Sequence, residues 1–387
     1  MVKAIKVMLI PNNVQKTKMF QYAGASRFAY NWALAREIEN YEKGGKFLSD
    51  AELRKEFTKL RHSDEYAWLL NISNNVTKQA VKDACTAYKN FFRGLQKFPR
   101  FKSKKRAMPK FYQDNVKIRF SNTHVKFEGF SSSRKANKQK MNWVRLAEHG
   151  RIPINAKYMN PRISFDGLNW WISVCVEFPD CRETLNDDGV GIDLGIKDLA
   201  ICSDGTKYKN INKSQKVKKL EKQKRRLQRS ISRSYEKNKK GESYCKTNNV
   251  IKKEKLLLKR NHRLTNIRKN YLNQTISEIV DRKPRFICIE DLNVSGMMKN
   301  RHLSKAVQAQ GFFWFRKQLE YRCSDKGIQL IVADRFYPSS KLCSCCGNIK
   351  KDLKLSDRVY RCACGNMIDR DFQASINLKT YGEKFAG

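Results

Sequence analysis

Residues 343–364 hold five cysteines at spacings that suit a metal site. Cys343 and Cys346 form a C-x2-C pair followed by a glycine, and Cys362 and Cys364 form a tighter pair that also precedes a glycine. Thiolates on tight turns of this kind surround a tetrahedral zinc ion at ~2.3 Å. We therefore expect Zn²⁺ to be bound by Cys343, Cys346, Cys362 and Cys364.

The fifth thiol of this segment, Cys345, could take the place of Cys346. We place it outside the ligand set because x2 is the better established spacing for a zinc turn. An iron–sulfur cluster is the second choice of metal. Nothing in the segment suggests an open coordination position, and so short a polar segment has little core of its own. The metal is therefore expected to be structural.

Three acids at separate places in the chain could carry catalysis: Asp193 in VGIDLG, Glu290 in FICIED and Asp371 in DRDFQA. Taken singly, each has an ordinary explanation, because an acid at a strand end can cap a turn and Asp371 could be a helix N-cap. Taken together, apolar strands that end in acids would bring several carboxylates to one edge of a sheet. Crowded carboxylates repel one another and do not all stay ionised without a cation.

Magnesium would relieve this repulsion. Mg²⁺ binds a few carboxylates together with waters and phosphate oxygens. Two ions ~3.5–4 Å apart stabilise both the attacking and the leaving oxygen of a phosphodiester displacement. We therefore predict a site for two Mg²⁺ ions formed by Asp193, Glu290 and Asp371.

The net charge of the chain indicates a polyanionic partner. Among 387 residues, 80 are Lys or Arg and 37 are Asp or Glu, which gives a formal net charge of +43. Solubility alone needs a net charge of only about 2–8 for a small domain, so we expect nucleic acid as the partner. A membrane surface is the lesser alternative, since no apolar run approaches the ~20 residues of a spanning helix.

The other seven cysteines are scattered singly, several of them in apolar contexts such as SVCVEF and FICIED. Cysteine is an ordinary small core residue in such places. Single thiols beside one metal cluster are typical of a reducing compartment. The apolar stretch in MVKAIKVMLIPNN is too short for a secretory signal, and we expect a cytoplasmic protein.

The first half of the chain predicts a small β-barrel with a helical insertion. Residues 2–10 predict a strand, and residues 14–42, 49–61 and 75–96 predict helices. From 115 to 178, short β-rich runs such as VKIRF, HVKFEG and WWISVCVEF are separated by turn residues. We place these strands in one barrel with the N-terminal strand.

Residues 98–111, FPRFKSKKRAMPKF, interleave aromatic and basic side chains. A solvated linker would explain the charge, but the aromatic residues favour a track that contacts phosphates and stacks on bases. The candidates for phosphate contact in this segment are Arg100, Lys102, Lys104 and Lys105.

After the polar linker 184–189, strands alternate with helices, which predicts an α/β architecture. Two strands are expected within 190–205, and buried strands at 285–292 and 328–336. Helices are expected at 311–327 and 371–382.

Residues 214–233 and 250–280 predict an antiparallel helical hairpin. Its first helix carries ten Lys and Arg from Lys213 to Arg233 against one acid. A solvated charged face is the ordinary explanation, and contact with nucleic-acid backbone is the functional one. The candidates for that contact are Lys218, Lys219, Arg225 and Arg226.

Four segments in this order closely resemble the TnpB family: GIDLGIKDLA, ICIEDLNVSGM, RFYPSSKLCSCCG and CACGNMIDRDFQASINL. Members of that family are transposon-encoded, RNA-guided DNA endonucleases with a split RuvC (RNase H-like) domain, and they are similar to the type V CRISPR effectors. The resemblance is strong over about residues 188–382 and weaker in the N-terminal half, where YNWALA matches. The chain departs from the family at Gln373 and Ser375, where Asn and Ala are frequent, but it keeps all three acids.

The resemblance implies an α/β multidomain fold. It implies a wedge-like β-barrel (1–12 and 98–183) with an inserted helical recognition domain (13–97). It also implies a RuvC-like nuclease domain (184–336 and 368–387) that contains the basic hairpin 213–282, and a zinc ribbon at 337–367.

The resemblance further implies that Asp193, Glu290 and Asp371 are the RuvC triad and that Cys343, Cys346, Cys362 and Cys364 hold the zinc of the ribbon. In the triplet Asp369-Arg370-Asp371, the family's catalytic acid corresponds to Asp371, so Asp369 is expected to orient or cap. The ribbon is expected to lie beside Asp371 for topological rather than catalytic reasons.

The resulting hypothesis is an RNA-guided, Mg²⁺-dependent DNA endonuclease that cuts target double-stranded DNA beside a short target-adjacent motif. The guide RNA would derive from the transposon end, and the protein would act as a monomer on that RNA in the prokaryotic cytoplasm, associated with the nucleoid. Guide pairing would read most of the sequence. Two alternatives stay open: a guided DNA-binding regulator without cleavage, which the intact triad disfavours, and an RNase H-like transposase, because such sites perform both reactions.

Overall fold

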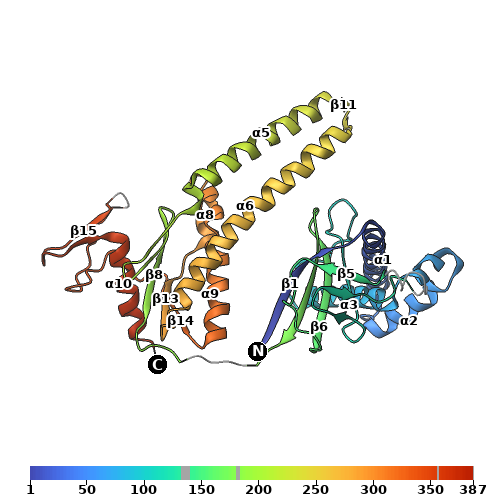
Figure 1. The fold of residues 1–387 in the computed structure, drawn as a ribbon, viewed down its shortest axis with the longest axis horizontal. Coiled ribbons are helices and arrows are strands. Elements are labelled where there is room, and N and C mark those ends of the chain that lie inside the picture. The colour runs from blue at the N-terminus through green and yellow to red at the C-terminus, as the bar shows by residue number, and fades with distance from the viewer. Residues whose placement is uncertain (132–139, 180–183, 355–356, 387) are drawn as a thin grey trace. The chain divides into compact units, whose positions relative to one another are not determined.

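The computed structural model describes residues 1–131, 140–179, 184–354 and 357–386 (Figure 1). The chain divides into two compact units, Met1–Pro179 and Asp180–Gly387. Each unit has a hydrophobic core of its own, as expected of separate domains.

The first unit is built on a seven-stranded sheet with the order β2-β6-β7-β1-β5-β4-β3. The N-terminal strand β1 (Val2–Ile10) lies at its centre and is antiparallel to both of its neighbours. The other strands are β2 (Lys110–Tyr112), β3 (Arg119–Phe120), β4 (His124–Lys126), β5 (Trp143–Leu146), β6 (Tyr158–Phe165) and β7 (Trp170–Glu177).

The strand order shows whether hydrogen bonds between the end strands close the sheet into the predicted barrel. Strands β2 and β3 stand at the two ends of the order. Among the described residues no backbone pairing joins them, so the hydrogen-bonded sheet is open, and closure into a barrel stays a prediction. Strand β3 is also shorter than the expected run, because Asp114 accepts the backbone N–H groups of Val116 and Lys117 (both 3.0 Å) and holds that stretch in a turn.

Helices inserted after β1 cover this sheet: α1 (Asn13–Glu42), α2 (Asp50–Arg61), the 3₁₀ helix η1 (Asp64–Asn71) and α3 (Asn74–Phe92). A capping box at Asn12 and Gln15 starts α1, with bonds of 2.8 and 3.0 Å. The buried ring of Tyr22 in α1 stacks on Phe111 of β2, with ring centroids 5.5 Å apart, and thereby joins the helical layer to the sheet.

The second unit is built on a five-stranded sheet with the order β10-β9-β8-β13-β14. Strands β8, β13 and β14 are parallel neighbours, whereas β9 and β10 are antiparallel to the strands beside them. The apolar runs of β8 and β13 are buried on both faces, as is usual for parallel strands. The strands are β8 (Val190–Leu194), β9 (Asp198–Cys202), β10 (Lys207–Lys209), β13 (Phe286–Glu290) and β14 (Gln329–Ala333).

Helices cover both faces of this sheet. Alternate residues of a strand face opposite sides. In β13, Ile287 and Ile289 pack with α6 (Asn248–Val280) and α9 (Phe312–Lys326), whereas Phe286 and Cys288 pack with α10 (Arg370–Glu383). The short helices α7 (Val294–Lys299) and α8 (Ser304–Gln310) lie between β13 and α9 in the sequence.

Helix α10 lies unusually close to the sheet because two glycines permit it. A Cβ atom at Gly191 of β8 would come within 2.0 Å of the Ser375 carbonyl oxygen, and one at Gly382 within 2.3 Å of the Phe286 ring. Any larger side chain at either position would push the helix away from the strands. The close packing fixes the N-terminus of α10 beside the carboxyl ends of β8 and β13.

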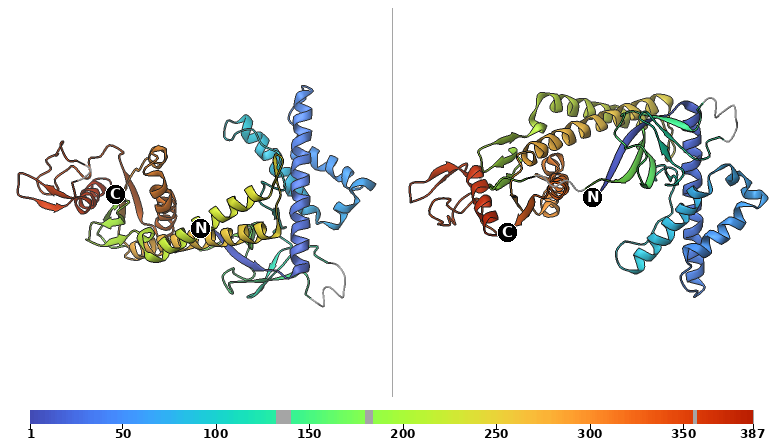
Figure 2. Two further views of the ribbon diagram at one scale, coloured as in Figure 1. Left: turned by 90° about the horizontal axis from the view of Figure 1, so that it is seen from above. Right: turned by 60° about the horizontal axis from the view of Figure 1, so that its bottom comes forward.

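A helical hairpin extends from the second unit (Figures 1 and 2). It consists of α5 (Gln215–Lys237) and of α6, the next helix in the sequence. Both figures show the two helices side by side. A thin apolar seam of Val217, Leu220 and Leu264 holds the hairpin together. The 3₁₀ helix η2 (Ile211–Lys213) precedes it, and strands β11 (Lys239–Lys240) and β12 (Ser243–Tyr244) pair at its tip.

The cysteine-rich segment lies between β14 and α10. Its strands β15 (Val359–Arg361) and β16 (Met367–Asp369) form a two-stranded antiparallel sheet that runs directly into α10. The expected helices and buried strands of the second unit are thus found within a few residues of their predicted bounds, and the α/β prediction for this unit is confirmed. Throughout the described part of the chain, no helix has the length and apolar character needed to cross a membrane.

Candidate active site and cysteine cluster

The structure brings the three predicted acids together at one edge of the second sheet. Every second residue of a strand faces the same side of the sheet. Asp193 therefore faces the same side as Gly191, and Glu290 the same side as Phe286 and Cys288. This is the side that α10 covers. Asp371 lies in the first turn of α10. All three carboxylates line one pocket of about 390 Å³.

Crowding and burial disfavour the ionised form of Asp193. Its pKa is raised well above the usual value, first by burial and then by the negative charges of Glu290 and Asp371. A cation among the three carboxylates would offset the charge that they share. Their oxygen donors and the open pocket fit a hard ion such as Mg²⁺.

Glu290 is held by a buried serine. The hydroxyl of Ser339, which is 4% exposed, donates a hydrogen bond to the Glu290 carboxylate. Burial and the charge of Asp371 raise the pKa of Glu290, whereas this hydrogen bond opposes the rise. Ser339 is itself fixed, because its carbonyl oxygen accepts a 2.7 Å hydrogen bond from the buried amide of Asn377 in α10.

Asp369 and Asp371 have different surroundings. Asp369 is the N-cap of α10, as expected, and its carboxylate accepts the backbone N–H groups of Asp371 and Phe372 at 3.1 and 3.0 Å. Asp371 faces the pocket, where Arg370 Nη2 lies 3.2 Å from its Oδ1 and Arg358 Nη1 lies 3.9 Å from its Oδ2.

Sequence reasoning missed several residues that line this pocket or hold its acids. Arg370 could have been noticed because it stands between two acids, but no sequence signal marks Ser339 as the partner of Glu290. Cationic side chains far apart in the sequence also converge here, which gives the acidic site a basic lining suited to a polyanion. They are Lys197, Lys341, Lys354, Arg358 and Arg370.

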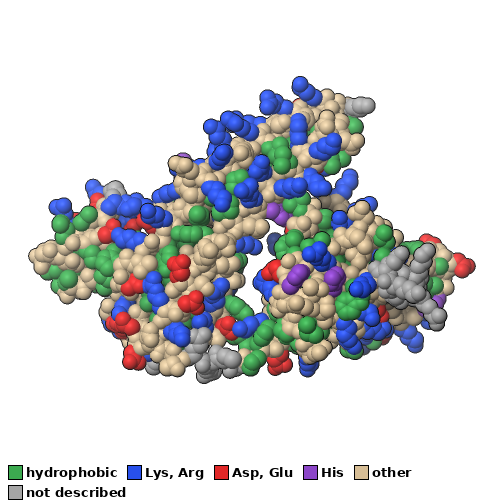
Figure 3. All heavy atoms as spheres, in the orientation of Figure 1, with side chains coloured by type: hydrophobic (Ala, Val, Ile, Leu, Met, Phe, Trp, Pro, Cys, Tyr) green, Lys and Arg blue, Asp and Glu red, His purple; other side chains and the backbone are tan. Residues whose placement is uncertain are grey.

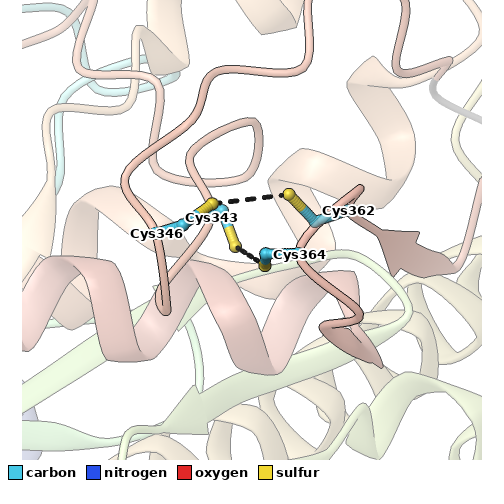
Figure 4. Close-up of side chains that lie close together, drawn as sticks. All are labelled: Cys343, Cys346, Cys362 and Cys364. Carbon is cyan, nitrogen blue, oxygen red and sulfur yellow. Dashed lines mark hydrogen bonds between the residues drawn. The ribbon is translucent and has the colours of Figure 1, made fainter.

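The four predicted cysteine ligands also converge (Figure 4). The Sγ atoms of Cys343, Cys346, Cys362 and Cys364 all lie within 4.8 Å of one another. Two of these separations are 3.7 Å, between Cys343 and Cys364, and 3.6 Å, between Cys346 and Cys362. Four thiolates around a zinc ion at ~2.3 Å form a tetrahedron with edges of about 3.8 Å, so the cluster fits zinc.

Cys345 lies outside this group and is exposed. Each cysteine pair instead sits on a tight turn, because the N–H groups of Gly347 and Gly365 bond back to the carbonyls of Cys343 (3.0 Å) and Cys362 (3.1 Å). Both glycines have positive φ, +74° and +90°, a conformation that other residues rarely adopt.

The ionisation of Cys343 also suits a metal ligand. Burial opposes its ionisation, but the backbone N–H of Cys346 and the Asn366 amide outweigh burial and lower the pKa of the thiol to about 6. A thiol with this pKa is largely thiolate at neutral pH, and the thiolate is the form that binds metal.

The cysteine-rich segment contacts α10 directly. The buried Gln373 of α10 accepts a 2.9 Å hydrogen bond from Asn366, which lies between the second cysteine pair and β16. The same side chain donates a 2.8 Å bond to the carbonyl of Leu342, next to Cys343. The expected topological relation between the ribbon and the helix that carries Asp371 is therefore also a physical contact, in which the buried amides of Gln373 and Asn377 take part.

Many Lys and Arg side chains lie along the visible face of the α5–α6 hairpin (Figure 3). The predicted contact residues Lys218, Lys219, Arg225 and Arg226 are all exposed. On the same hairpin, Arg268 is paired with Glu221 at 3.0 Å and holds the two helices together. The hairpin therefore carries both exposed Lys and Arg side chains and an Arg side chain that is engaged in an ion pair between its helices.

The basic segment 98–111 also contains both exposed and engaged cationic side chains. Arg100, Lys104 and Lys105 are exposed. Lys102 is half-buried, with its ammonium 2.9 Å from the centre of the Tyr30 ring, and its backbone bonds to Asn31. Burial and the nearby charge of Lys110 lower the pKa of Lys102 to about 7, so it differs from its exposed neighbours.

Three segments of the chain match known protein families. Residues 312–378 match a family described as "Cas12f1-like, TNB domain", and residues 173–301 match one described as "Probable transposase". Residues 1–46 match a "Helix-turn-helix domain", although in this chain they contain β1 and the single long helix α1.

Two relatives align over nearly the whole chain. "Putative RNA-guided DNA endonuclease InsQ" of Escherichia coli (strain K12) is 30% identical over 379 residues, which cover 93% of this chain and 87% of that protein. "Putative RNA-guided DNA endonuclease" of Streptomyces pristinaespiralis is 28% identical and covers 98% of this chain and 89% of its own length.

A solved structure shares the fold. It is described as "Cryo-EM structure of the Cas12f1-sgRNA-target DNA complex", and it superposes with a TM-score of 0.60 over 98% of both chains at 10% identity. The similarity to the bacterial relatives over nearly the whole chain, together with the matches of residues 173–301 and 312–378, shows that the chain belongs to the TnpB family.

Proposed function

We propose that this protein is an RNA-guided, Mg²⁺-dependent DNA endonuclease associated with a transposable element. The observation that carries the proposal is the single pocket in which Asp193, Glu290 and Asp371 meet among five cationic side chains. Three carboxylates without a cation repel one another, as the raised pKa values of Asp193 and Glu290 indicate. The same carboxylates with a divalent cation would form a phosphodiesterase site.

In this proposal Asp193, Glu290 and Asp371 would hold Mg²⁺, which supplies Lewis-acid stabilisation of the charge that develops during phosphodiester hydrolysis. Ser339 orients the Glu290 carboxylate, and Asp369 fixes the helix start that carries Asp371. Arg358 and Arg370 attract and orient the DNA phosphate beside the acids. The strand order of the sheet and its two covered faces support the RuvC (RNase H-like) interpretation.

Zinc has a separate, structural role. Cys343, Cys346, Cys362 and Cys364 would hold Zn²⁺ with no open position, since four thiolates complete a tetrahedron. The metal would stabilise the ribbon. The ribbon in turn fixes Gln373 and with it the N-terminal part of α10.

The partners are a transposon-end-derived guide RNA and double-stranded target DNA, bound by a protein monomer. The names of the relatives and of the similar solved structure support guide RNA and target DNA. The exposed cations on α5 and at Arg100, Lys104 and Lys105 would contact the backbone of these nucleic acids. Guide pairing would read most of the target, and the first unit would read the short adjacent motif.

The experiment that tests this function compares the parent with Asp193→Ala. Protein co-purified with its RNA should cut DNA that matches the RNA, in Mg²⁺ and not in EDTA, and the variant should bind the same DNA without cutting. Equal cutting by both proteins would remove Asp193 from the mechanism. Binding without cutting by the parent would favour a DNA-binding regulator.

A transposase is the second candidate, because residues 173–301 match a family described as "Probable transposase". Sites of this chemistry can perform strand transfer as well as hydrolysis. Incubation of the complex with labelled transposon ends and a target plasmid separates the two reactions. Joined products would support the transposase, and linear cleaved target alone would support the endonuclease.

A further inference from the structure

A second pocket adjoins the catalytic pocket on the other side of Glu290. Its volume is about 200 Å³, and it shares Leu194, Glu290 and Phe312 with the pocket that holds the triad. The two pockets are therefore neighbours that meet at these shared side chains.

Apolar and polar side chains line the second pocket in similar measure, and its two cations are Arg316 and Arg335. Leu292 and Val294 form one part of it, and the aromatic start of α9 forms another. Phe312 and Phe315 of α9 are 2% and 0% exposed and belong to the core. Phe313 also lines the pocket but is 65% exposed. A large ring that stays open to solvent inside a site offers a stacking surface.

The polar groups around this pocket are already largely engaged. Arg316 and Arg335 both bind Asp291, with Arg316 Nη1 2.7 Å from Oδ1 and Arg335 Nε 3.0 Å from Oδ2. The side-chain oxygen of Asn293 accepts the backbone N–H of Gly296 at 2.9 Å. The pocket thus offers the exposed ring of Phe313, while its two arginines are already bound to Asp291.

We propose that this pocket receives the nucleobase next to the scissile phosphate, stacked on the ring of Phe313. The proposal rests on the proposed nuclease function and adds a base subsite to it. A phosphodiester held by the triad and by the cations of the first pocket has its flanking base within one nucleotide of Glu290. The second pocket shares Glu290 with the first and presents the ring of Phe313 there.

Two consequences follow from the chemistry of the pocket. Stacking is tolerant of sequence, because every base has a π-face, so cleavage shows little base preference at this nucleotide. A base in the pocket cannot also be paired, so the strand at the active site is unpaired at that point.

The decisive measurement uses 2-aminopurine, whose fluorescence is quenched by stacking. The RNA-bound Asp193→Ala protein is mixed with target DNAs that each carry one 2-aminopurine at successive positions of the strand to be cut. One position should be quenched on binding. Phe313→Ala and Phe313→Leu, made in the same Asp193→Ala background, should lose that change, and Phe313→Trp should keep it. Leucine is the sharper test, because it preserves an apolar side chain without an aromatic face.

The control is Phe336→Ala. Phe336 is 88% exposed and lines neither of the two pockets, so its loss should leave the quench unchanged. A quench that survives in Phe313→Leu, or that disappears equally in Phe336→Ala, would overturn the proposal.

Cleavage provides the second readout. In a protein that retains Asp193, Phe313→Ala should slow single-turnover cutting about five- to 150-fold, the range expected for loss of one base–aromatic stack. An abasic nucleotide at the quenched position should slow the parent by a similar factor and should not slow Phe313→Ala further. Additive effects would show that the ring and the base do not interact.

Failure of the nuclease function is distinguishable from failure of the subsite. A parent that does not cut contradicts the proposed function, whereas the fluorescence measurement needs no cutting and still decides whether Phe313 stacks on a base.

Discussion

The carboxylate of Asp369 accepts the backbone N–H of Asp371 at 3.1 Å, so two acids separated by one residue have different roles. Asp369 satisfies the free N–H groups at the start of α10. Asp371 is thereby turned into the pocket that it shares with Asp193 and Glu290. The division of roles follows from the position of the helix start.

Substitution of these two acids should have unequal effects. Asp371→Asn should slow cutting by more than about 100-fold, since even the partners of metal ligands contribute ~10–100-fold. Asp369→Asn should cut nearly as well as the parent, because asparagine is also a good N-cap. Asp369→Ala should lose about 1 kcal/mol of stability. Single-turnover cleavage and thermal unfolding measure the two effects, and a slower reaction for Asp369→Asn than for Asp371→Asn would reverse the assignment.

Ser339 should matter through Glu290. Ser339→Ala should slow cutting by ~10–100-fold and raise the Mg²⁺ concentration needed for half-maximal rate. The lost hydrogen bond had held the pKa of Glu290 down, so the acidic limb of the pH–rate profile should move to higher pH. Ser339→Thr keeps the hydroxyl and should restore the rate. An unchanged pH profile in Ser339→Ala would exclude this role.

Asp193→Asn should stabilise the metal-free protein at neutral pH. The pKa of Asp193 in the folded protein is raised above its unfolded value, so ionisation of this group weakens folding as the pH rises through the folded pKa. Below the unfolded value of about 3.9 both states are protonated and the penalty is absent. In EDTA, the variant should unfold at a higher temperature than the parent at pH 7.5, and the difference should vanish near pH 4. A variant that is less stable at pH 7.5 would contradict the crowding of these acids.

The neighbouring cysteines 345 and 346 form a matched pair for the zinc site. Cys346→Ser should lose bound zinc and lower the unfolding temperature, because its Sγ belongs to the group of four. Cys345→Ser should retain one zinc per chain, because Cys345 is exposed and lies outside that group. Metal analysis of both purified variants gives their zinc content. Loss of zinc from Cys345→Ser but not from Cys346→Ser would show that Cys345, and not Cys346, is the ligand.

The sequence was sufficient to predict most elements of the second unit and the acids that meet there. Buried parallel strands have long apolar runs, and a strand that ends in an acid is visible in the sequence itself. A cysteine pair followed by a glycine likewise predicts a tight turn that can direct both thiols to a metal ion. The contacts of Ser339 and Gln373 could not be predicted in this way, because they depend on how α10 packs against Gly191 and Gly382.

The cationic residues show the same limit. Charge in the sequence does not distinguish an exposed lysine from one that is folded inward. The sequence places Lys102 in one basic group with Arg100, Lys104 and Lys105, yet its ammonium lies over the ring of Tyr30. Its place depends on the hydrogen bonds between its backbone and Asn31, a residue of α1.

The central claim is that a bound RNA directs cutting by the site of Asp193, Glu290 and Asp371. The most direct test replaces the guide segment of the co-purifying RNA with an unrelated sequence and maps the cuts on a plasmid that carries both targets. The proposed function predicts that cutting moves from the old target to the new one, requires Mg²⁺ and is lost in Asp371→Asn. Cuts that stay at the old target, or that occur equally without RNA, would contradict it.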